Sequence, residues 1–165
     1  MDTLIRGRVW KFGDNVDTDV MAPWNSLDLP IEERTKVTLH IRPEFATTVR
    51  PGDVIVAGRN WGCGSSREQA PENLRALGLA AVVAESFGRI YFRSCIAMAF
   101  PNVVCPGVAA AFEDGDELEL DLMASRVRNR THGIDLHAVP YAPEMLRIIE
   151  KGGLMNVLKE RLATS

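Results

Sequence analysis

The chain has 165 residues, of which 46% are hydrophobic and 25% are charged, a composition that excludes disordered, collagen-like and coiled-coil proteins. Its formal net charge is −3 and no basic stripe runs along it, so we expect no nucleic-acid partner. A chain of this length buries about 70% of the surface that its unfolded form exposes, which is enough for a core without disulfides or metals. The sequence therefore predicts a single domain, residues 1–165.

Neither secretion nor membrane insertion is expected. Residues 1–8 lack the apolar segment of a signal peptide, and no later segment approaches 18 consecutive apolar residues. The three cysteines, Cys63, Cys95 and Cys105, form no C-x-x-C pair, so neither a disulfide framework nor a zinc site is predicted. We expect a cytoplasmic protein that does not associate with membranes.

The predicted elements alternate between strands and helices. In chain order they are a strand over 4–12, an acidic loop over 14–19, an irregular stretch or short helix over 21–30, a strand over 54–57, a helix over 67–77, a strand over 80–84, a helix over 89–100, a strand over 103–105, strands over 117–122 and 134–139, and helices over 143–151 and 154–163. The strand-helix-strand-helix-strand order in the middle predicts parallel pairing with right-handed crossovers. The fold class is therefore α/β, with additional antiparallel strands.

The most informative segment is the glycine-rich turn Asn60–Glu68, which follows a predicted strand and precedes a predicted helix. Glycines let the backbone turn sharply, and the free N–H groups of a helix start favour an anion. Ser65 and Glu68 also fit a capping box, so a purely structural role is equally compatible with these residues. Pro71 suits the first turn of the helix, which places the helix start as late as Ala70.

Two other site classes are not supported by this turn. It lacks the third glycine of the dinucleotide motif G-x-G-x-x-G, and no acidic residue follows a second strand at the required distance. A serine hydrolase is also disfavoured, because G-x-S-x-G is absent and His40, His132 and His137 lie in no nucleophile context.

Three motifs in order give the chain a family resemblance. They are Asn15–Asp19 (NVDTD), Gly62–Glu68 (GCGSSRE) and Glu85–Arg93 (ESFGRIYFR). Together they resemble the small subunits of 3-isopropylmalate dehydratases, which correspond to the swivel domain of the aconitase superfamily. The resemblance covers most of residues 5–110, and the chain from about residue 111 onward matches only in general character.

This resemblance implies a swivelling β/β/α domain. It also implies a hydro-lyase of leucine biosynthesis, and so of branched-chain amino-acid biosynthesis. Such an enzyme is active only as a heterodimer with a large subunit. In that family the large subunit holds a 4Fe-4S cluster through its own cysteines, so no cofactor or metal is expected on this chain. Its three cysteines are then expected to be buried, inert thiols. The substrate class implied is a small hydroxy-diacid.

The resemblance also assigns roles to residues. Ser65 would be the catalytic base, acting as an alkoxide that the turn's N–H groups and Arg67 stabilise. Gly64, Ser66 and Arg67 would bind substrate carboxylates. The specificity loop would contain Asp17, Thr18, Asp19, Trp24 and Asn25. For Asp17, Thr18 and Asp19, fixing of the loop by side-chain hydrogen bonds is an equally open role.

The sequence departs from the family after this acidic loop, where the usual arginine and tyrosine are missing from Val20–Asp28. Trp24 suits an isopropyl or other short alkyl group, whereas the missing arginine argues against homocitrate. Arg34 is a possible substitute whose position the sequence does not fix. Arg89 and Arg93 lie four residues apart, and carboxylate binding and ordinary salt bridges are both open for them.

Two alternative functions remain at this level. One is the same chemistry on another substituted malate, such as citramalate or dimethylmalate, or the hydration of maleate. The other is a diacid-binding module without chemistry, which would bind diacids without a large subunit. An exposed apolar surface is expected where the large subunit docks, and self-association of the isolated chain is plausible for the same reason.

Overall fold

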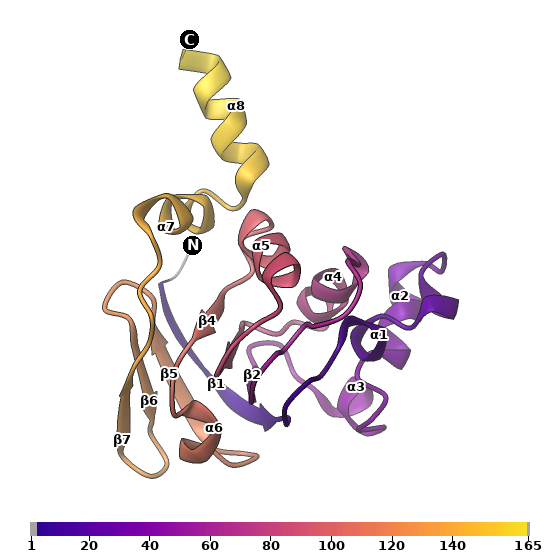
Figure 1. The fold of residues 1–165 in the computed structure, drawn as a ribbon, viewed down its shortest axis with the longest axis vertical. Helices are drawn as coiled ribbons and strands as arrows, with labels where there is room; N and C mark the ends of the chain where they lie inside the picture. Colours follow the sequence, from indigo (N-terminus) through magenta and orange to yellow (C-terminus); the bar gives the residue numbers. More distant parts are fainter. Residues whose placement is uncertain (1–2, 165) are drawn as a thin grey trace.

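The computed structural model describes residues 3–164, so the ends of the predicted domain, residues 1–2 and 165, lie outside it. Its described part contains a curled seven-stranded sheet in the order β4-β3-β2-β1-β5-β6-β7, flanked by helices (Figure 1). The strands are β1 (Leu4–Lys11), β2 (Val54–Ala57), β3 (Ala81–Ala84), β4 (Asn102–Val104), β5 (Glu117–Asp121), β6 (Arg126–Asn129) and β7 (Ile134–His137). The α-helices are α1 (Thr18–Met21), α2 (Ile31–Arg34), α3 (Phe45–Thr48), α4 (Gln69–Ala76), α5 (Arg89–Ala97), α6 (Val108–Ala111), α7 (Pro143–Glu150) and α8 (Leu154–Thr164), and the 3-10 helices are η1 (Trp24–Ser26) and η2 (Thr35–Val37).

Strands β1 to β4 are parallel to one another, which confirms the pairing expected from the alternation of strands and helices. All four residues of β2 and all four of β3 are buried. Continuous apolar runs of this kind are typical of strands that are covered on both faces. Val54 and Val56 pack into one core cluster, while Ile55 and Ala57 pack into a second cluster on the opposite face.

Different elements cover the two faces of the parallel strands. One core cluster joins them to α4 and to residues 16–45, through Met21, Leu39, Phe45 and Leu74. The other joins them to α6, α7 and the antiparallel strands, through Val108, Ile149, Leu118, Leu120 and Val127. The sheet therefore lies between a helical layer and its own curled antiparallel extension (Figure 1).

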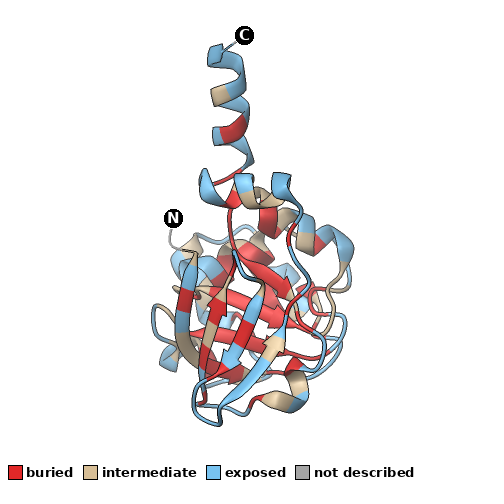
Figure 2. Ribbon diagram, turned by 90° about the vertical axis from the view of Figure 1, so that its left-hand side faces the viewer, coloured by how far each residue is buried: buried red, intermediate tan, exposed pale blue. Residues whose placement is uncertain are grey.

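Strands β5 to β7 are antiparallel, and β5 pairs with the opposite edge of β1. Along β5 and β6 buried and more exposed residues alternate, and in Figure 2 exposed residues mark the outer strands. Strand β6 was not predicted, because RVRN carries only one hydrophobic residue, Val127, on its inward face. Four helices of four residues each were also not predicted, because they are too short to show helical periodicity: α2, α3, α6 and α1, whose first residues fall in the predicted acidic loop.

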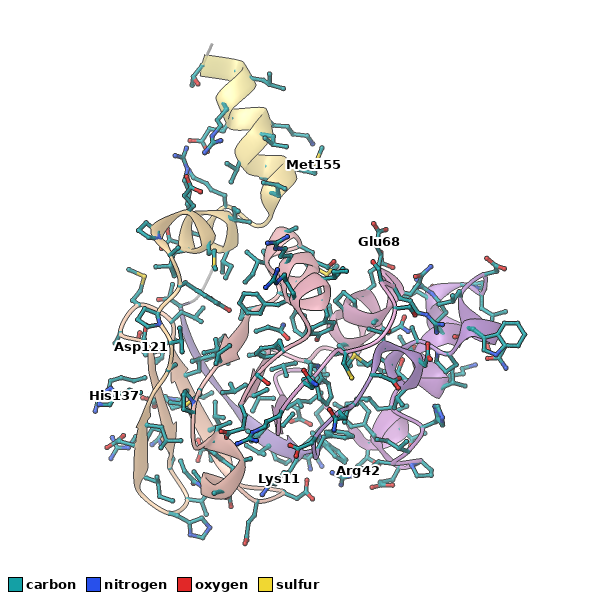
Figure 3. All side chains as sticks on the ribbon, in the orientation of Figure 1. Lys11, Arg42, Glu68, Asp121, His137 and Met155 are labelled. Atoms are coloured by element: carbon teal, nitrogen blue, oxygen red, sulfur yellow. The ribbon has the colours of Figure 1, made fainter. Side chains whose placement is uncertain are left out.

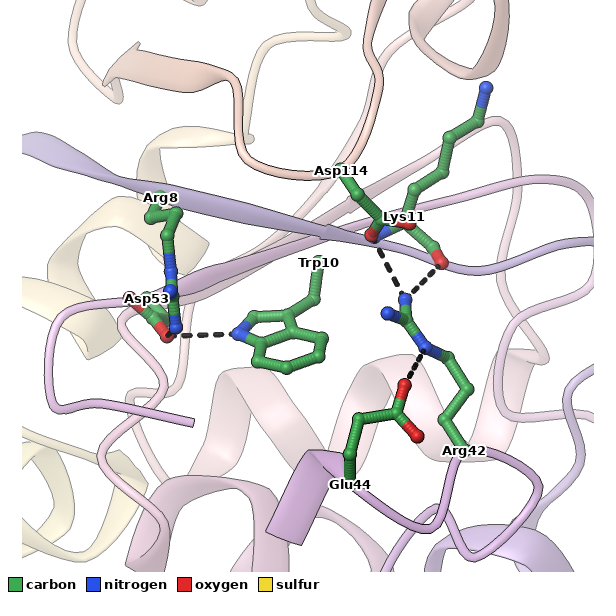
Figure 4. Close-up of polar contacts among 7 residues, drawn as sticks. All are labelled: Arg8, Trp10, Lys11, Arg42, Glu44, Asp53 and Asp114. Atoms are coloured by element: carbon green, nitrogen blue, oxygen red, sulfur yellow. Dashed lines mark hydrogen bonds and ion pairs between the residues drawn. The ribbon is translucent and has the colours of Figure 1, made fainter. Parts of the chain in front are cut away.

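One arginine links the segment between β1 and β2 to the rest of the sheet (Figure 4). The Arg42 guanidinium donates to the Asp114 carboxylate at 2.9 Å, to the Lys11 carbonyl at 3.0 Å and to the Glu44 carboxylate at 3.1 Å. It also lies over the Trp10 ring at 4.8 Å from the centroid. Asp114 belongs to the loop before β5, so this contact joins the parallel and antiparallel parts of the sheet.

The C-terminal helix α8 projects from the body of the protein (Figure 1). Val157 is its one buried residue in the described part, and Glu160 forms ion pairs with Arg147 of α7 and with Lys151, which follows α7. Met155 points into solvent (Figure 3) and is 64% exposed. No helix within residues 3–164 combines the length and the hydropathy that crossing a bilayer requires.

Candidate active site

The carboxyl ends of three adjacent parallel strands bring the three sequence motifs together. Strand β1 leads to the NVDTD loop, β2 leads to the glycine-rich turn, and β3 leads to the segment that starts α5. Parallel bridges extend the pairing beyond the strands, from Asp17 to Cys63 and from Trp61 to Phe87. Open α/β sheets bind ligands at the carboxyl ends of their strands, so the motifs meet where a ligand site is expected.

Glycine is required where the turn packs against α5. Gly62 has φ +79°, and a Cβ atom built on it would lie 2.3 Å from Cγ of Tyr91. A Cβ on Gly88 would lie 2.5 Å from the Gly62 carbonyl oxygen. Below the turn, Trp61 Nε1 donates to the Tyr91 hydroxyl at 3.1 Å. Glycine is therefore needed at both positions 62 and 88 for the turn to pack against the start of α5.

The NVDTD loop holds the other side of the turn. Thr18 is buried, its N–H donates to the Cys63 carbonyl at 2.9 Å, and its hydroxyl donates to the Ser65 carbonyl at 2.6 Å. The Asp17 carboxylate caps α1 by accepting from the Val20 N–H at 3.1 Å. The loop-fixing role of Asp17 and Thr18 is thus directly visible in the geometry.

The predicted capping box is not formed. Helix α4 begins at Gln69, and its N-cap Glu68 makes no side-chain capping hydrogen bond. Ser65 lies in the turn ahead of the helix, where Thr18 fixes its carbonyl group. The capping-box interpretation of Ser65 and Glu68 is therefore wrong, and the Ser65 side chain is not engaged in capping the helix.

A cavity of about 370 Å³ opens beside the turn. Its walls are Thr18, Gly62, Cys63, Gly64, Ser65, Ser66, Arg67, Gly88, Arg89, Ile90, Tyr91 and Ser94. The side chains of Ser65 and Ser66 make no hydrogen bond with any described residue, and the N–H groups of Gly64, Ser65 and Ser66 likewise find no acceptor there. The cavity thus presents unused hydrogen-bond donors, two arginines and no carboxylate.

The two arginines of the cavity differ in their partners. Arg67 is 15% exposed, forms a 2.6 Å ion pair with Asp19 and donates to the Ala22 carbonyl at 2.6 Å. Arg89 is exposed and has no ion-pair partner within residues 3–164. Arg93, one turn further along α5, also has no such partner and does not line the cavity. The salt-bridge interpretation of Arg89 and Arg93 is therefore wrong within the described chain.

Comparison with known proteins then identifies the family. The model of the aconitase C-terminal domain matches residues 32–103. The 3-isopropylmalate dehydratase small subunit 1 of Methanopyrus kandleri is 50% identical over 96% of this chain and 95% of its own length. The chain belongs to the 3-isopropylmalate dehydratase small-subunit family. This is a family of hydro-lyase subunits within the aconitase superfamily, as the resemblance implied.

Two further relatives extend the comparison. The methanogen homoaconitase small subunit of Methanothermobacter thermautotrophicus is also 50% identical, over 94% of this chain and 91% of its own. A crystal structure of 3-isopropylmalate dehydratase from Methanocaldococcus jannaschii superposes with a TM-score of 0.91 at 36% identity and covers 98% of this chain and 96% of that one. The swivel-type fold is confirmed, and the limit set at residue 111 was too narrow, because the small-subunit family matches nearly the whole chain.

The structure does not bring the rest of the predicted specificity loop to this cavity. Trp24 is 77% exposed on η1, and neither it nor Asn25 lines the cavity. Arg34 is buried on α2, where its two terminal nitrogens contact the Glu72 carboxylate at 3.3 Å. It therefore braces α2 against α4, and its guanidinium is not free to serve the loop after Asp19.

The sequence analysis overlooked three cavity residues, Ile90, Tyr91 and Ser94. All three belong to α5, and Ile90 and Ser94 lie four residues apart on one side of it. The signal was available, because the third motif of the family resemblance runs through Arg93. Only its arginines were considered, and the neighbouring uncharged residues at helical spacing were not.

The cysteines of this chain do not fit an iron–sulfur cluster. Burial raises the pKa of Cys95 to about 12 and that of Cys105 to about 11, so both thiols stay protonated. Cys63 is half-buried at the cavity wall, so the expectation of a buried thiol is wrong for this residue. Among the described residues, no three His, Cys, Asp or Glu side chains gather in a way that would hold a metal.

Proposed function

We propose that this chain is the small subunit of an iron–sulfur hydro-lyase that interconverts 3-isopropylmalate and 2-isopropylmalate in leucine biosynthesis, and that it works only with a large subunit. The observation that carries the proposal is the cavity beside the glycine-rich turn. There Ser65 and Ser66 stand among unused N–H donors, and none of the residues that line the cavity carries a carboxylate. Such a surface favours an anionic ligand with two carboxylates.

Ser65 is the proposed base. A serine hydroxyl is almost fully protonated in water at neutral pH, so the alkoxide must be stabilised by its surroundings. The free N–H groups of Gly64, Ser65 and Ser66 and the nearby Arg67 guanidinium supply fixed positive dipoles and charge. These gain strength when the cleft closes and water leaves. The Ser65 alkoxide would take the proton from the carbon beside a substrate carboxylate.

Ser66, Gly64 and Arg67 would orient the substrate. The Ser66 hydroxyl and the Gly64 N–H are unengaged donors, and Arg67 is held in place by Asp19 and the Ala22 carbonyl. An arginine fixed in this way loses little conformational entropy when a carboxylate arrives. Asp19 thus acts as the residue that positions Arg67, while Trp24 and Asn25 would approach the substrate only when the large subunit closes the site.

The large subunit completes the proposed enzyme. We assign the 4Fe-4S cluster, which would polarise the departing hydroxyl group, to that partner, because the thiols of this chain do not fit a cluster. The complex would be cytoplasmic. The apolar side chains exposed on η1 and α8 are consistent with association of the isolated chain, either with that partner or with itself.

The choice of diacid is the finer part of the proposal. Relatives named for 3-isopropylmalate and for homoaconitate chemistry are equally identical to this chain, so overall identity does not separate them. A short alkyl substituent is favoured because Arg34 is withdrawn to Glu72, which leaves the loop after Asp19 without a free cation for a third carboxylate. Citramalate and dimethylmalate share this requirement and form the second candidate class.

The test is turnover by the complex assembled and loaded with its cluster under anaerobic conditions. The ultraviolet absorbance of the unsaturated diacid is followed for 3-isopropylmalate, citramalate, dimethylmalate, homocitrate and maleate. We expect 3-isopropylmalate to be the best substrate, and Ser65→Ala to lower kcat by about 10²–10⁴-fold in a complex that still assembles. Cys63→Ser, at the same wall, is the matched control and should retain activity. A loaded complex that turns over no diacid, while the isolated chain binds diacids tightly, would establish the binding module instead.

A further inference from the structure

One of the two arginines that line the cavity, Arg89, has no role in the proposed function. A hydroxy-diacid carries two carboxylates at neutral pH, and the described cavity wall contains only Arg67 and Arg89 as charged residues. The Asp19 carboxylate, at 2.6 Å from Arg67, already forms an ion pair with that guanidinium. The remaining unpaired positive charge on the wall is Arg89, to which the proposed function gives no role.

We propose that Arg89 is a second carboxylate-binding residue, which holds the substrate carboxylate that Arg67 and Ser66 do not hold. This inference rests on the proposed function. It follows from the two elements that line the cavity: Ser65, Ser66 and Arg67 come from the turn after β2, and Arg89 comes from the start of α5. A diacid bound in this cavity can place one carboxylate against each element.

The backbone around Arg89 suits the same role. The first helical hydrogen bond of α5 runs from the Phe92 N–H to the Gly88 carbonyl at 3.0 Å. The N–H groups of Arg89, Ile90 and Tyr91 therefore precede the helical ladder, and all three residues line the cavity. Gly88 caps the helix without a side chain, and no described residue accepts a hydrogen bond from those N–H groups. An anion bound by the Arg89 guanidinium would also lie at the N-terminus of α5, which is the positive end of the helix dipole.

A different use of Arg89 is a salt bridge to an acidic residue of the large subunit. The cavity favours the substrate because Arg89 shares it with the base and the serine pair, whereas Arg93 on the same helix is exposed outside it. Arg93 is thus the matched control: same helix, same residue type, no ion-pair partner in the described chain, and no place on the cavity wall.

The experiment compares Arg89→Gln, Arg89→Lys and Arg93→Gln in the assembled complex. Co-purification with the large subunit is measured first, and steady-state kinetics with the diacid of highest turnover follow. We expect Arg89→Gln to raise KM by about 10–100-fold, the range for a lost hydrogen bond to a charged group. Arg89→Lys should recover part of that loss because it restores the charge without the fork. Arg93→Gln should match the wild type.

Two inhibitors locate the contact on the ligand. Isopropylsuccinate carries both carboxylates without the hydroxyl group, and 4-methylpentanoate carries one. The wild-type complex should bind the diacid more tightly than the monoacid, and Arg89→Gln should lose at least about tenfold of this preference. A preference unchanged in Arg89→Gln overturns the inference, as does loss of co-purification in Arg89→Gln but not in Arg93→Gln. Failure of the proposed function looks different, because the wild-type complex itself would then turn over no diacid.

Discussion

The parallel strands β1–β4 and the antiparallel strands β5–β7 share one sheet, but they expose their side chains very differently. Every residue of β2 and β3 is buried, whereas β6 and β7 expose Arg126, Arg128 and Asp135 to solvent. The parallel part is covered on both faces, and the cavity lies at the carboxyl ends of its strands. In the antiparallel part short turns join the strands, and none of the candidate site residues lies there.

The difference teaches where substitutions should matter for activity. In the parallel part the loops after β1, β2 and β3 brace one another through Thr18, Gly62 and Gly88, so a change in one is transmitted to the base. In the antiparallel part no described residue lines the cavity. Paired substitutions of the same type, one in each part, therefore test whether the two parts are as independent as the geometry indicates.

The largest effect is expected from a glycine pair. Gly62→Ala should lower the free energy of unfolding by about 2–5 kcal/mol, because a left-handed backbone costs about 1–2 kcal/mol and the clash with Tyr91 about 1–3 kcal/mol more. Gly133→Ala, in the turn between β6 and β7, has φ +69° and nothing within 4 Å of the new Cβ. It should cost only the backbone part, about 1–2 kcal/mol.

Urea denaturation of the two variants measures this difference, and activity of the assembled complex separates them further. Gly62→Ala should abolish turnover by moving Ser65, while Gly133→Ala should keep it. Equal losses of stability in the two variants would mean that the turn does not sit as tightly on Tyr91 as the 2.3 Å approach requires.

A threonine pair sharpens the comparison. Thr18→Val removes the hydroxyl that donates to the Ser65 carbonyl at 2.6 Å, and should cost about 1 kcal/mol of stability and about tenfold in kcat as Ser65 loses its fixed position. Thr131 accepts from the Glu117 N–H at 2.9 Å on the exposed surface of the antiparallel part. Thr131→Val should change stability by about 0.5 kcal/mol or less.

The readout that decides this pair is kcat. We expect kcat to fall in Thr18→Val and to stay at the wild-type value in Thr131→Val, with KM little changed in both. If the two variants have the same kcat, the NVDTD loop does not position the base, and its hydrogen bonds to the turn serve folding alone.

The same two parts differ in how well the sequence predicted them. The apolar runs Val54–Ala57 and Ala80–Ala84 predicted buried parallel strands, and the motifs after them led to the cavity, because the carboxyl ends of such strands converge. In the antiparallel part β6 was missed, since its charged residues point outward and leave Val127 as the only apolar signal.

Within the site, the errors come from contacts between residues distant in sequence. The Ser65 to Glu68 spacing indicated a capping box, but Thr18, 47 residues away, fixes the Ser65 carbonyl and keeps the turn ahead of the helix. The partner of Arg34 is Glu72, on a helix that the local pattern around Arg34 does not reveal. Local spacing predicts local bonds well, whereas tertiary partners decide which of them form.

The smallest expected effect lies at the contact between the two parts, where Arg42 meets Asp114. Partial burial opposes ionisation of Asp114, but the hydrogen bonds from the Lys11 N–H and from Arg42 outweigh it and hold its pKa below the ordinary 3.8. A carboxyl with a lowered pKa in the folded state adds stability above its unfolded pKa, and that stability is lost as the pH falls through the folded pKa.

Arg42→Gln should therefore lower the free energy of unfolding by about 1 kcal/mol at neutral pH, a value that allows for the 56% exposure of Asp114 and includes the contact with the Trp10 ring. Urea denaturation of both proteins at a series of pH values is the measurement. The difference between them should hold from neutral pH down to about pH 5 and then shrink below the ordinary pKa of Asp114, leaving the contact with the ring and the hydrogen bond to the Lys11 carbonyl. A difference that does not vary with pH would show that Arg42 stabilises the fold through the Trp10 ring and the Lys11 carbonyl alone, and that its ion pair with Asp114 adds nothing to the association of the two parts.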